Sequence, residues 1–208
     1  MSGKATVTYF HHSGFSVAVD DTLMVFDYWR GENGEIKDTA ALSESDFKGF
    51  EQVLFFVSHE HPDHYDKVIY DFKHLSKVHY IIADDMPADA HGDRIGVGET
   101  RRYGDVKVKA YGSTDLGVSF YISCGGLNIF FAGDLNLWHW REESTLRQIT
   151  QAEHMYYACV EQMLGKPIDL CFFPGGSAHG RHVRGGRQSF HHGDEAACVY
   201  SHALAWPH

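Results

Sequence analysis

The sequence lacks the features that define several common protein classes. No segment contains about 18 consecutive apolar residues, so we do not expect a transmembrane helix. Residues 1–10 lack the long apolar segment of a secretory signal, and the four cysteines form no C-x-x-C pair. These absences predict a cytoplasmic protein with reduced thiols. No G-x-S-x-G sequence occurs, which argues against a serine hydrolase.

An excess of positive charge is also missing. The formal net charge is -10 at pH 7, so the sequence shows no basic footprint for nucleic acid. A nuclease remains possible in principle, because a metal site supplies its own positive charge. Histidine, in contrast, is abundant, with 16 among 208 residues. The positions of these histidines therefore need an explanation.

The chain length suits one domain, and its apolar runs predict two sheets with helices outside them. Helical spacing is seen at residues 64–75 and 142–164, whereas residues 84–100 read as a polar loop. The expected strands are short, β-rich and bounded by turn residues. They cover residues 5–10, 14–19, 22–29, 52–58, 78–83, 106–112, 117–123, 127–134 and 168–174.

Histidine and aspartate crowd together directly after the strand at residues 52–58. His59, His61, Asp63 and His64 form the pattern H-x-H-x-D-H. Alternate residues at a strand end point the same way, so His59 and His61 can converge on one ion. The turn that follows brings Asp63 and His64 beside them, in a position suited to a second ion. Imidazole with carboxylate oxygen suits zinc, and also iron or manganese.

Two further acids end predicted strands. Asp134 ends the predicted strand at residues 127–134 in a Gly-Asp pair, where its carboxylate can bridge two cations. Asp27 lies near the end of the predicted strand at residues 22–29 and can orient a ligand histidine from behind, with a capped turn as the alternative.

Two aromatic and histidine-rich stretches lie near these acids. His11 and His12 precede Ser13-Gly14 at a strand junction. One of them can face the site and contact a substrate or a metal-bound group, and a simple turn position is an equal alternative. Trp138, His139 and Trp140 follow the Gly-Asp turn. They can form a wall of the pocket or a lid over the core.

Three segments resemble the metallo-β-lactamase fold superfamily of metal-dependent hydrolases. They are MVFDYW at residues 24–29, SHEHPDH at residues 58–64 and AGDLN at residues 132–136. The resemblance covers residues 5 to 174. The stretches HSGFSVAV and AGDLNLWHW are most similar to an uncharacterised bacterial branch near the lactonase-like hydrolases.

The resemblance implies an αββα sandwich with a dinuclear metal site at the sheet edges. His59, His61 and Asp134 would bind one ion, and Asp63, His64 and Asp134 would bind the other. Asp63 would also act as the catalytic residue that orients the attacking hydroxide. The expected cofactors are two divalent metal ions, zinc first, with manganese or iron as alternatives.

One histidine ligand of the family is missing between the H-x-H-x-D-H loop and Asp134. The corresponding stretch, KAYGSTDLGVSF at residues 109–120, contains no histidine. Asp115 is the nearest residue that can bind a metal there, with a turn cap as the equal alternative. An aspartate ligand would shift this site from zinc toward manganese, iron or magnesium. His79 and His91 also lie between, but their strand and loop contexts fit less well.

The last histidine ligand of the family, usually in a Pro-Met-His setting after an apolar strand, is also missing. Residues 175–208 contain six histidines, six glycines and no lysine. We expect residues 1–174 to form the metallo-β-lactamase-like domain and residues 175–208 to be a poorly ordered tail. His202 is the nearest candidate ligand, and its surroundings differ from the family pattern.

A frameshift would explain this tail. Codons that can encode residues 190–204, read one nucleotide out of step, give an apolar strand followed by Pro-Met-His. We infer one extra base near the codon of Pro174, and therefore the loss of the last strand–helix–strand unit of the fold. The coding DNA tests this inference directly.

The sequence thus predicts a hydrolase in which a metal-bridging hydroxide attacks a small-molecule ester, lactone, amide or phosphodiester. The alternatives are an inactive or weakly metal-binding truncated remnant of such an enzyme, and a metal-dependent nuclease. The expected partner is a small-molecule substrate, with no nucleic acid and no membrane. The oligomeric state is left open.

Overall fold

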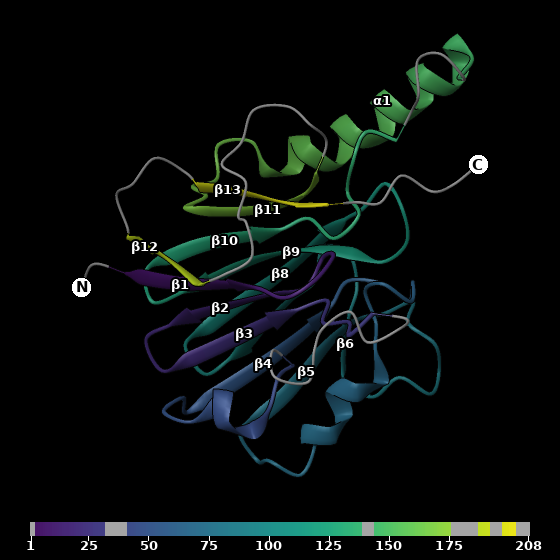
Figure 1. Cartoon of the computed structure of the whole chain (residues 1–208). Helices are drawn as coiled ribbons and strands as arrows, with labels where there is room; N and C mark the ends of the chain where they lie inside the picture. The colour runs from purple at the N-terminus through teal and green to yellow at the C-terminus, as the bar shows by residue number, and fades with distance from the viewer. Residues whose placement is uncertain (1–2, 32–40, 139–143, 176–186, 192–196, 203–208) are drawn as a thin grey trace.

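The computed structural model of the protein describes residues 3–31, 41–138, 144–175, 187–191 and 197–202. For residues 175, 187–191 and 197–202 only the backbone is described. Two sheets lie face to face, and the described helices lie on their outer sides (Figure 1). This is the predicted αββα sandwich.

The first sheet has seven strands in the order β12-β1-β2-β3-β4-β5-β6. From β3 to β6 the neighbouring strands are parallel, so their carboxyl ends share one edge. The bounds are β1 Lys4–Tyr9, β2 Phe15–Val19, β3 Thr22–Phe26, β4 Gln52–Val57, β5 Val78–Ala83, β6 Asp93–Ile95 and β12 Arg187–His191.

The second sheet has six strands in the order β13-β11-β10-β9-β8-β7. Strands β7 to β10 are antiparallel, and β10, β11 and β13 are parallel. The bounds are β7 Thr100–Tyr103, β8 Val106–Gly112, β9 Val118–Cys124, β10 Leu127–Phe131, β11 Leu170–Gly175 and β13 Ala197–His202.

Aromatic side chains fill the space between the sheets. Phe26 of β3 stacks on Phe56 of β4 and on Phe131 of β10, with ring centroids 4.9 Å and 4.7 Å apart. Phe172 of β11 lies 4.8 Å from Phe15 of β2. All five rings are almost completely buried. Because these rings join strands of both sheets just below the strand ends, they fix the distance between the loops above them.

Helical turns cover both outer faces. The 3-10 helices η1, Glu44–Phe47, and η2, Lys67–Phe72, pack Phe47 and Phe72 against Phe55 of the first sheet. Helix α1, Leu146–Val160, and the 3-10 helix η3, Glu161–Met163, lie over the second sheet. Thr145 caps α1 by accepting the N–H of Gln148.

Three expectations differ from the structure. Only Lys67–Phe72 of residues 64–75 is helical, as a 3-10 helix, because Asp66 accepts the N–H of Val68 and begins the helix there. The expected apolar stripe of residues 142–164 packs only partly against the sheet, because α1 has no fully buried residue and extends beyond the sheet (Figure 1). The predicted loop at residues 84–100 contains the edge strand β6 and the first residue of β7.

The tail carries two backbone strands, one at the edge of each sheet. β12 pairs with β1, and β13 pairs with β11. Among the described residues after β11 there is no helix, which agrees with the expected loss of a strand–helix–strand unit. The rest of the tail lies outside the described residues, so its predicted poor order and its origin in a frameshift stay predictions.

Candidate metal centre

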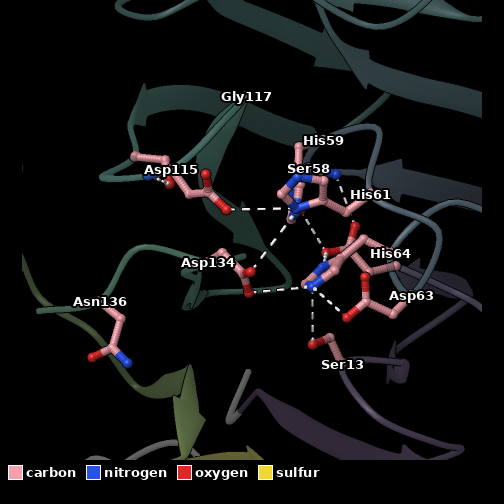
Figure 2. Close-up of polar contacts among 12 residues, drawn as sticks. Ser13, Ser58, His59, His61, Asp63, His64, Asp115, Gly117, Asp134 and Asn136 are labelled. Carbon is pink, nitrogen blue, oxygen red and sulfur yellow. Dashed lines mark hydrogen bonds and ion pairs between the residues drawn. The ribbon is translucent and has the colours of Figure 1, made fainter. Parts of the chain in front are cut away.

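The candidate metal centre lies where strands of both sheets end. Asp27 follows β3, Ser58 and His59 follow β4, and Asp134 comes three residues after β10. The β8–β9 loop and the β1–β2 turn reach the same place (Figure 2). Residues far apart in the sequence therefore meet because the sandwich brings these ends together.

The loop after β4 folds into one tight turn. The backbone N–H groups of His64 and Tyr65 donate to the carbonyl of His61 at 2.9 Å and 3.0 Å. This turn buries His59 and His64 completely and leaves the side chain of His61 35% exposed. The ring of His59 lies 4.6 Å from that of His61 and 4.1 Å from that of His64. The motif thus gathers its three imidazoles as the sequence predicted.

One set of donor atoms, here called the first group, comprises His59, His61, Asp115 and Asp134. Each offers one ligand atom within 4.8 Å of the others. Nε2 of His59 lies 3.0 Å from Nδ1 of His61, and Oδ2 of Asp115 lies 3.5 Å from the same Nδ1. The structure therefore brings Asp115 beside the histidines of the motif, and its role as a ligand stays a prediction.

A second set, here called the second group, comprises His12, Asp63 and His64, again with ligand atoms within 4.8 Å of one another. Nε2 of His12 lies 3.5 Å from Oδ2 of Asp63, and Nε2 of His64 lies 3.9 Å from the same oxygen. His12 is thus the histidine of the His11-His12 pair that faces the site.

The carboxylate of Asp134 lies between the two groups. Its Oδ1 is 3.2 Å from Nε2 of His64, and its Oδ2 is 3.8 Å from Nε2 of His59 (Figure 2). Each oxygen faces a histidine of a different group. This is the arrangement that a bridging carboxylate requires.

Asp27 orients two of the imidazoles from behind. Its buried carboxylate accepts hydrogen bonds from the Nδ1–H of His64 at 2.7 Å and from the backbone N–H and hydroxyl of Ser58 at 2.8 Å and 2.6 Å. The Ser58 hydroxyl, having donated its proton to Asp27, accepts from Nδ1–H of His59 at 2.9 Å. Both imidazoles are therefore held through Nδ1 and direct Nε2 into the site, where a cation can take the place of the proton on Nε2 of His64. This is the orienting role predicted for Asp27.

The electrostatics of the site favour positive charge at His64. Burial alone lowers the pKa of His64, but the hydrogen-bonded carboxylates of Asp134 and Asp27 outweigh it and raise the pKa to about 10. Burial, together with the neighbouring His64, lowers the pKa of His59 to about 4. Burial raises the pKa of Asp134, yet its contacts with His64 and His59 give a net lowering. A proton at His64 thus balances the carboxylates.

These donors fit divalent cations. Imidazole nitrogens with fixed tautomers and carboxylate oxygens are ligands for zinc, iron and manganese. The carboxylates of Asp27 and Asp134, 2.7 Å and 3.2 Å from the ring nitrogens of His64, stabilise positive charge where ligand atoms converge. Without a proton or a cation among them, the carboxylates in this small volume would repel one another and remain poorly solvated.

Glycine allows the β8–β9 loop to approach the histidine turn. Gly117 has φ +69°, and a Cβ there would lie 1.8 Å from the carbonyl oxygen of Ser58. That carbonyl accepts the N–H of Val118 at 3.0 Å. A side chain at Gly117 would therefore push the loop that carries Asp115 away from the histidines.

Several sequence candidates do not join the two groups. His79 is exposed on β5, and His91 is exposed with its ring 5.7 Å from that of Tyr70. Trp138 donates its ring N–H to the carbonyl of Asp134 at 2.9 Å, which places it at the wall of the site. His139 and Trp140 lie outside the described residues, as does the side chain of His202. Sequence reasoning missed Ser58, although it begins the motif and its hydroxyl suits a relay.

A cleft of about 200 Å³ opens beside the first group. It runs between α1 and the loops that carry Asp115 and Asp134. Its walls combine amide and hydroxyl groups with apolar surface, from Thr114, Asn136, Trp138, Gln148, Gln151, Ala152 and Met155.

In the described part of the chain, no helix is both long and apolar enough to cross a bilayer.

The chain belongs to the beta-lactamase superfamily, because the profile of the "Beta-lactamase superfamily domain" matches residues 6–152. The matched segment contains every residue of both groups. This match identifies the class of the chain, which is a superfamily of metallo-hydrolases. No curated protein matches the chain.

Solved structures show the same fold at low sequence identity. A protein of Parabacteroides distasonis assigned as a metal-dependent hydrolase is 17% identical, with a TM-score of 0.56 over 85% of this chain and 72% of its own. Igni18, a metallo hydrolase from Ignicoccus hospitalis, is also 17% identical, and its TM-score is 0.57 over 84% of this chain and 72% of its own. CmlA, a diiron β-hydroxylase from Streptomyces venezuelae, is 17% identical, and its TM-score is 0.52. The match covers 81% of this chain but 34% of CmlA.

Proposed function

We propose that this chain is a hydrolase that uses two divalent cations, one in each group, on a small-molecule ester, lactone, amide or phosphodiester. The observation that carries the proposal is the position of Asp134, whose Oδ2 is 3.8 Å from His59 and whose Oδ1 is 3.2 Å from His64. One carboxylate shared by two histidine-containing groups has a clear use when two cations are held side by side.

The residues have distinct roles in this proposal. His59, His61 and Asp115 hold one cation, His64 and Asp63 hold the other, and Asp134 contacts both. Bound cations would activate water as a nucleophile and stabilise negative charge that develops on the substrate. Asp63 is 30% exposed, so its carboxylate can also accept a hydrogen bond from that water and orient it.

Zinc is the first expectation for the metal, with manganese or iron as alternatives. The first group supplies two imidazoles and two carboxylates, which is richer in oxygen than a set of three imidazoles and one carboxylate. Carboxylate oxygen favours harder cations such as manganese and iron(II) more than imidazole does. The cleft beside this group offers hydrogen-bonding amides and an apolar wall, which suits an uncharged small molecule.

The experiment combines metal analysis with a substrate panel. The full chain, freed of metal with a chelator, is loaded with Zn²⁺, Mn²⁺ or Fe²⁺ and tested on a lactone, a carboxylic ester, an amide, bis-p-nitrophenyl phosphate and RNA. We expect two bound ions and turnover of at least one small substrate, which Asp134→Asn abolishes. Arg102→Gln, at an exposed position of the edge strand β7, is the matched control and keeps the activity.

The other outcomes decide against the proposal. A chain that binds no metal would be a truncated remnant of an enzyme, as the composition of the tail first suggested. Turnover of RNA with no small-molecule activity would identify a nuclease. Full activity of Asp134→Asn would show that the shared carboxylate has no role in the reaction.

A further inference from the structure

His12 is held in an unusual position at the turn between β1 and β2. It is only 8% exposed, and its backbone has φ 51°, a left-handed conformation that few residues other than glycine adopt. The N–H of Phe10 donates to the carbonyl of Gly14 at 2.9 Å, and the N–H of Gly14 donates to the carbonyl of His11 at 2.7 Å. These bonds close the turn and direct His12 inward.

The hydroxyl of Ser13 lies between the imidazoles of His12 and His64. Nδ1 of His12 lies 3.3 Å from the hydroxyl oxygen of Ser13, and this oxygen is 3.5 Å from Nε2 of His64. When Nδ1–H donates to Ser13, Nε2 of His12 keeps its lone pair on the side of Asp63. The edge of the imidazole also packs against Trp29, with ring centroids 5.8 Å apart.

The distances around His12 have the spacing of metal ligands. Oδ2 of Asp63 is 3.5 Å from Nε2 of His12 and 3.9 Å from Nε2 of His64. A direct hydrogen bond between such groups would be about 2.7–2.9 Å long. Two ligand atoms that each lie about 2.0–2.1 Å from a tetrahedral ion are about 3.4 Å apart. The gap between these three atoms is therefore wide for a hydrogen bond and suited to a cation.

We propose that His12 is a direct ligand of the second cation, together with Asp63 and His64. It supplies a third protein donor in a chain whose residues 175–208 contain no Pro-Met-His sequence. The inference rests on the proposed two-cation hydrolase, and it adds that the N-terminal hairpin completes the second group. Asp134 then closes this site through Oδ1, 3.2 Å from His64.

The test measures metal stoichiometry rather than activity. The metal-free full chain is titrated with Zn²⁺ and with Co²⁺, and bound metal is counted by elemental analysis and by the Co²⁺ absorption spectrum. The principal variant is His12→Asn, because asparagine tolerates the left-handed backbone and removes the imidazole. We expect wild type to bind two ions, and His12→Asn to keep one at unchanged affinity and bind the other about 10-fold more weakly or worse.

Controls separate a ligand from a structural role. His11→Asn changes the neighbouring histidine of the same turn, and we expect it to bind two ions like wild type. Thermal melting in chelator compares the metal-free folds, and we expect His12→Asn to melt within a few degrees of wild type. If it melts much lower, His12→Asp is measured instead, because it restores a ligand and should recover Mn²⁺ binding at the second group.

Each other outcome is decisive. Two tight ions in His12→Asn would overturn this inference and leave the proposed hydrolase intact. Loss of the second ion in His202→Ala, but not in His12→Asn, would assign the ligand to the tail. A wild type that binds no ion, or a single ion removed by His59→Ala alone, would overturn both this inference and the proposed two-cation hydrolase.

Discussion

The carboxylate of Asp27 accepts a hydrogen bond from Nδ1 of His64 across 2.7 Å, with both side chains completely buried. The same oxygen also accepts the hydroxyl of Ser58, at 2.6 Å. One acid at the end of β3 therefore positions the motif after β4 through two separate contacts. The hydrogen bonds explain why this buried carboxylate is part of the centre, since it orients the imidazoles from behind.

Asp27→Asn is expected to weaken metal binding without removing any ligand. The amide keeps the shape and tolerates the positive φ of 40°, but it cannot accept hydrogen bonds at both oxygens. The imidazoles of His59 and His64 then lose their fixed tautomers. We expect metal affinity to fall about 10–100-fold, measured by competition with a chromophoric chelator.

The matched control for Asp27→Asn is Asp169→Asn. Asp169 accepts the backbone N–H of Asn128 at 2.8 Å at the opposite end of β10, far from the histidines. We expect this variant to lose stability but to bind metal as wild type does. Equal loss of affinity in both variants would mean that general destabilisation, and not the orientation of the imidazoles, controls binding.

Gly117→Ala is expected to separate the β8–β9 loop from the histidine turn. The new Cβ would meet the carbonyl oxygen of Ser58 at 1.8 Å and Cβ of His59 at 2.8 Å. Overpacking together with the positive φ should cost about 3 kcal/mol or more of unfolding free energy, measured by urea denaturation of the metal-free chain.

Gly98→Ala provides the comparison, because Gly98 has φ +87° and nothing within 4 Å of the added Cβ. It should cost only the backbone strain, about 1–2 kcal/mol. Similar losses for Gly117→Ala and Gly98→Ala would show that the close approach to Ser58 has little energetic effect.

The strands at the centre of each sheet were predictable because burial on both sides leaves an apolar run in the sequence. The expected ranges 78–83 and 106–112 coincide with β5 and β8. The edge strands β6 and β7 were not predicted as such. Their side chains are mostly exposed and polar, and only backbone pairing defines them.

The candidate site was predictable where its residues are contiguous. The motif at residues 59–64 places its own side chains together through one turn. The pairing of His12 with Asp63 was not predictable, since 51 residues separate them and only the hairpin position of β1 and β2 brings them to 3.5 Å. For helix α1 the prediction of a helix was correct, but the prediction that its apolar stripe packs on the sheet was not, because the helix extends past the sheet.

Stability is expected to fall at alkaline pH, in part because of Cys124. Burial, with a further contribution from Asp20, raises the pKa of this thiol from about 9 to about 11. Between these values the unfolded chain ionises its thiol and the folded chain does not. The contribution of this thiol to the free energy of unfolding is therefore fully present below pH 9 and is lost as the pH rises toward 11. Between these values the free energy of unfolding falls by about 1 kcal/mol per pH unit because of this group.

Urea denaturation between pH 7 and pH 11 checks this sign. Cys124→Ala should have a lower stability at neutral pH but a flatter decline above pH 9. Ile122→Val, on the same strand without a titrating group, should decline as steeply as wild type. An unchanged slope in Cys124→Ala would assign the alkaline loss to other groups, such as Tyr80, whose pKa is also raised by burial.

Asp115→His tests whether the unusual acid of the first group is a ligand. Oδ2 of Asp115 lies 3.5 Å from Nδ1 of His61, so an imidazole at this position can reach the same cation. Zinc binds more tightly than manganese to most sites, so the ratio of the two affinities is the useful quantity. Replacing a hard carboxylate with imidazole should shift this ratio toward zinc by about 10-fold.

Asp115→Asn completes the argument, because it removes the charge and keeps the size of the side chain. If Asp115 is a ligand, this variant should bind both metals more weakly, with little change in their ratio, whereas Asp115→His changes the ratio itself. Competition titrations with Zn²⁺ and Mn²⁺ measure both quantities. If Asp115 only caps the β8–β9 loop, neither variant should alter either affinity, and the first group would then rest on His59, His61 and Asp134 alone.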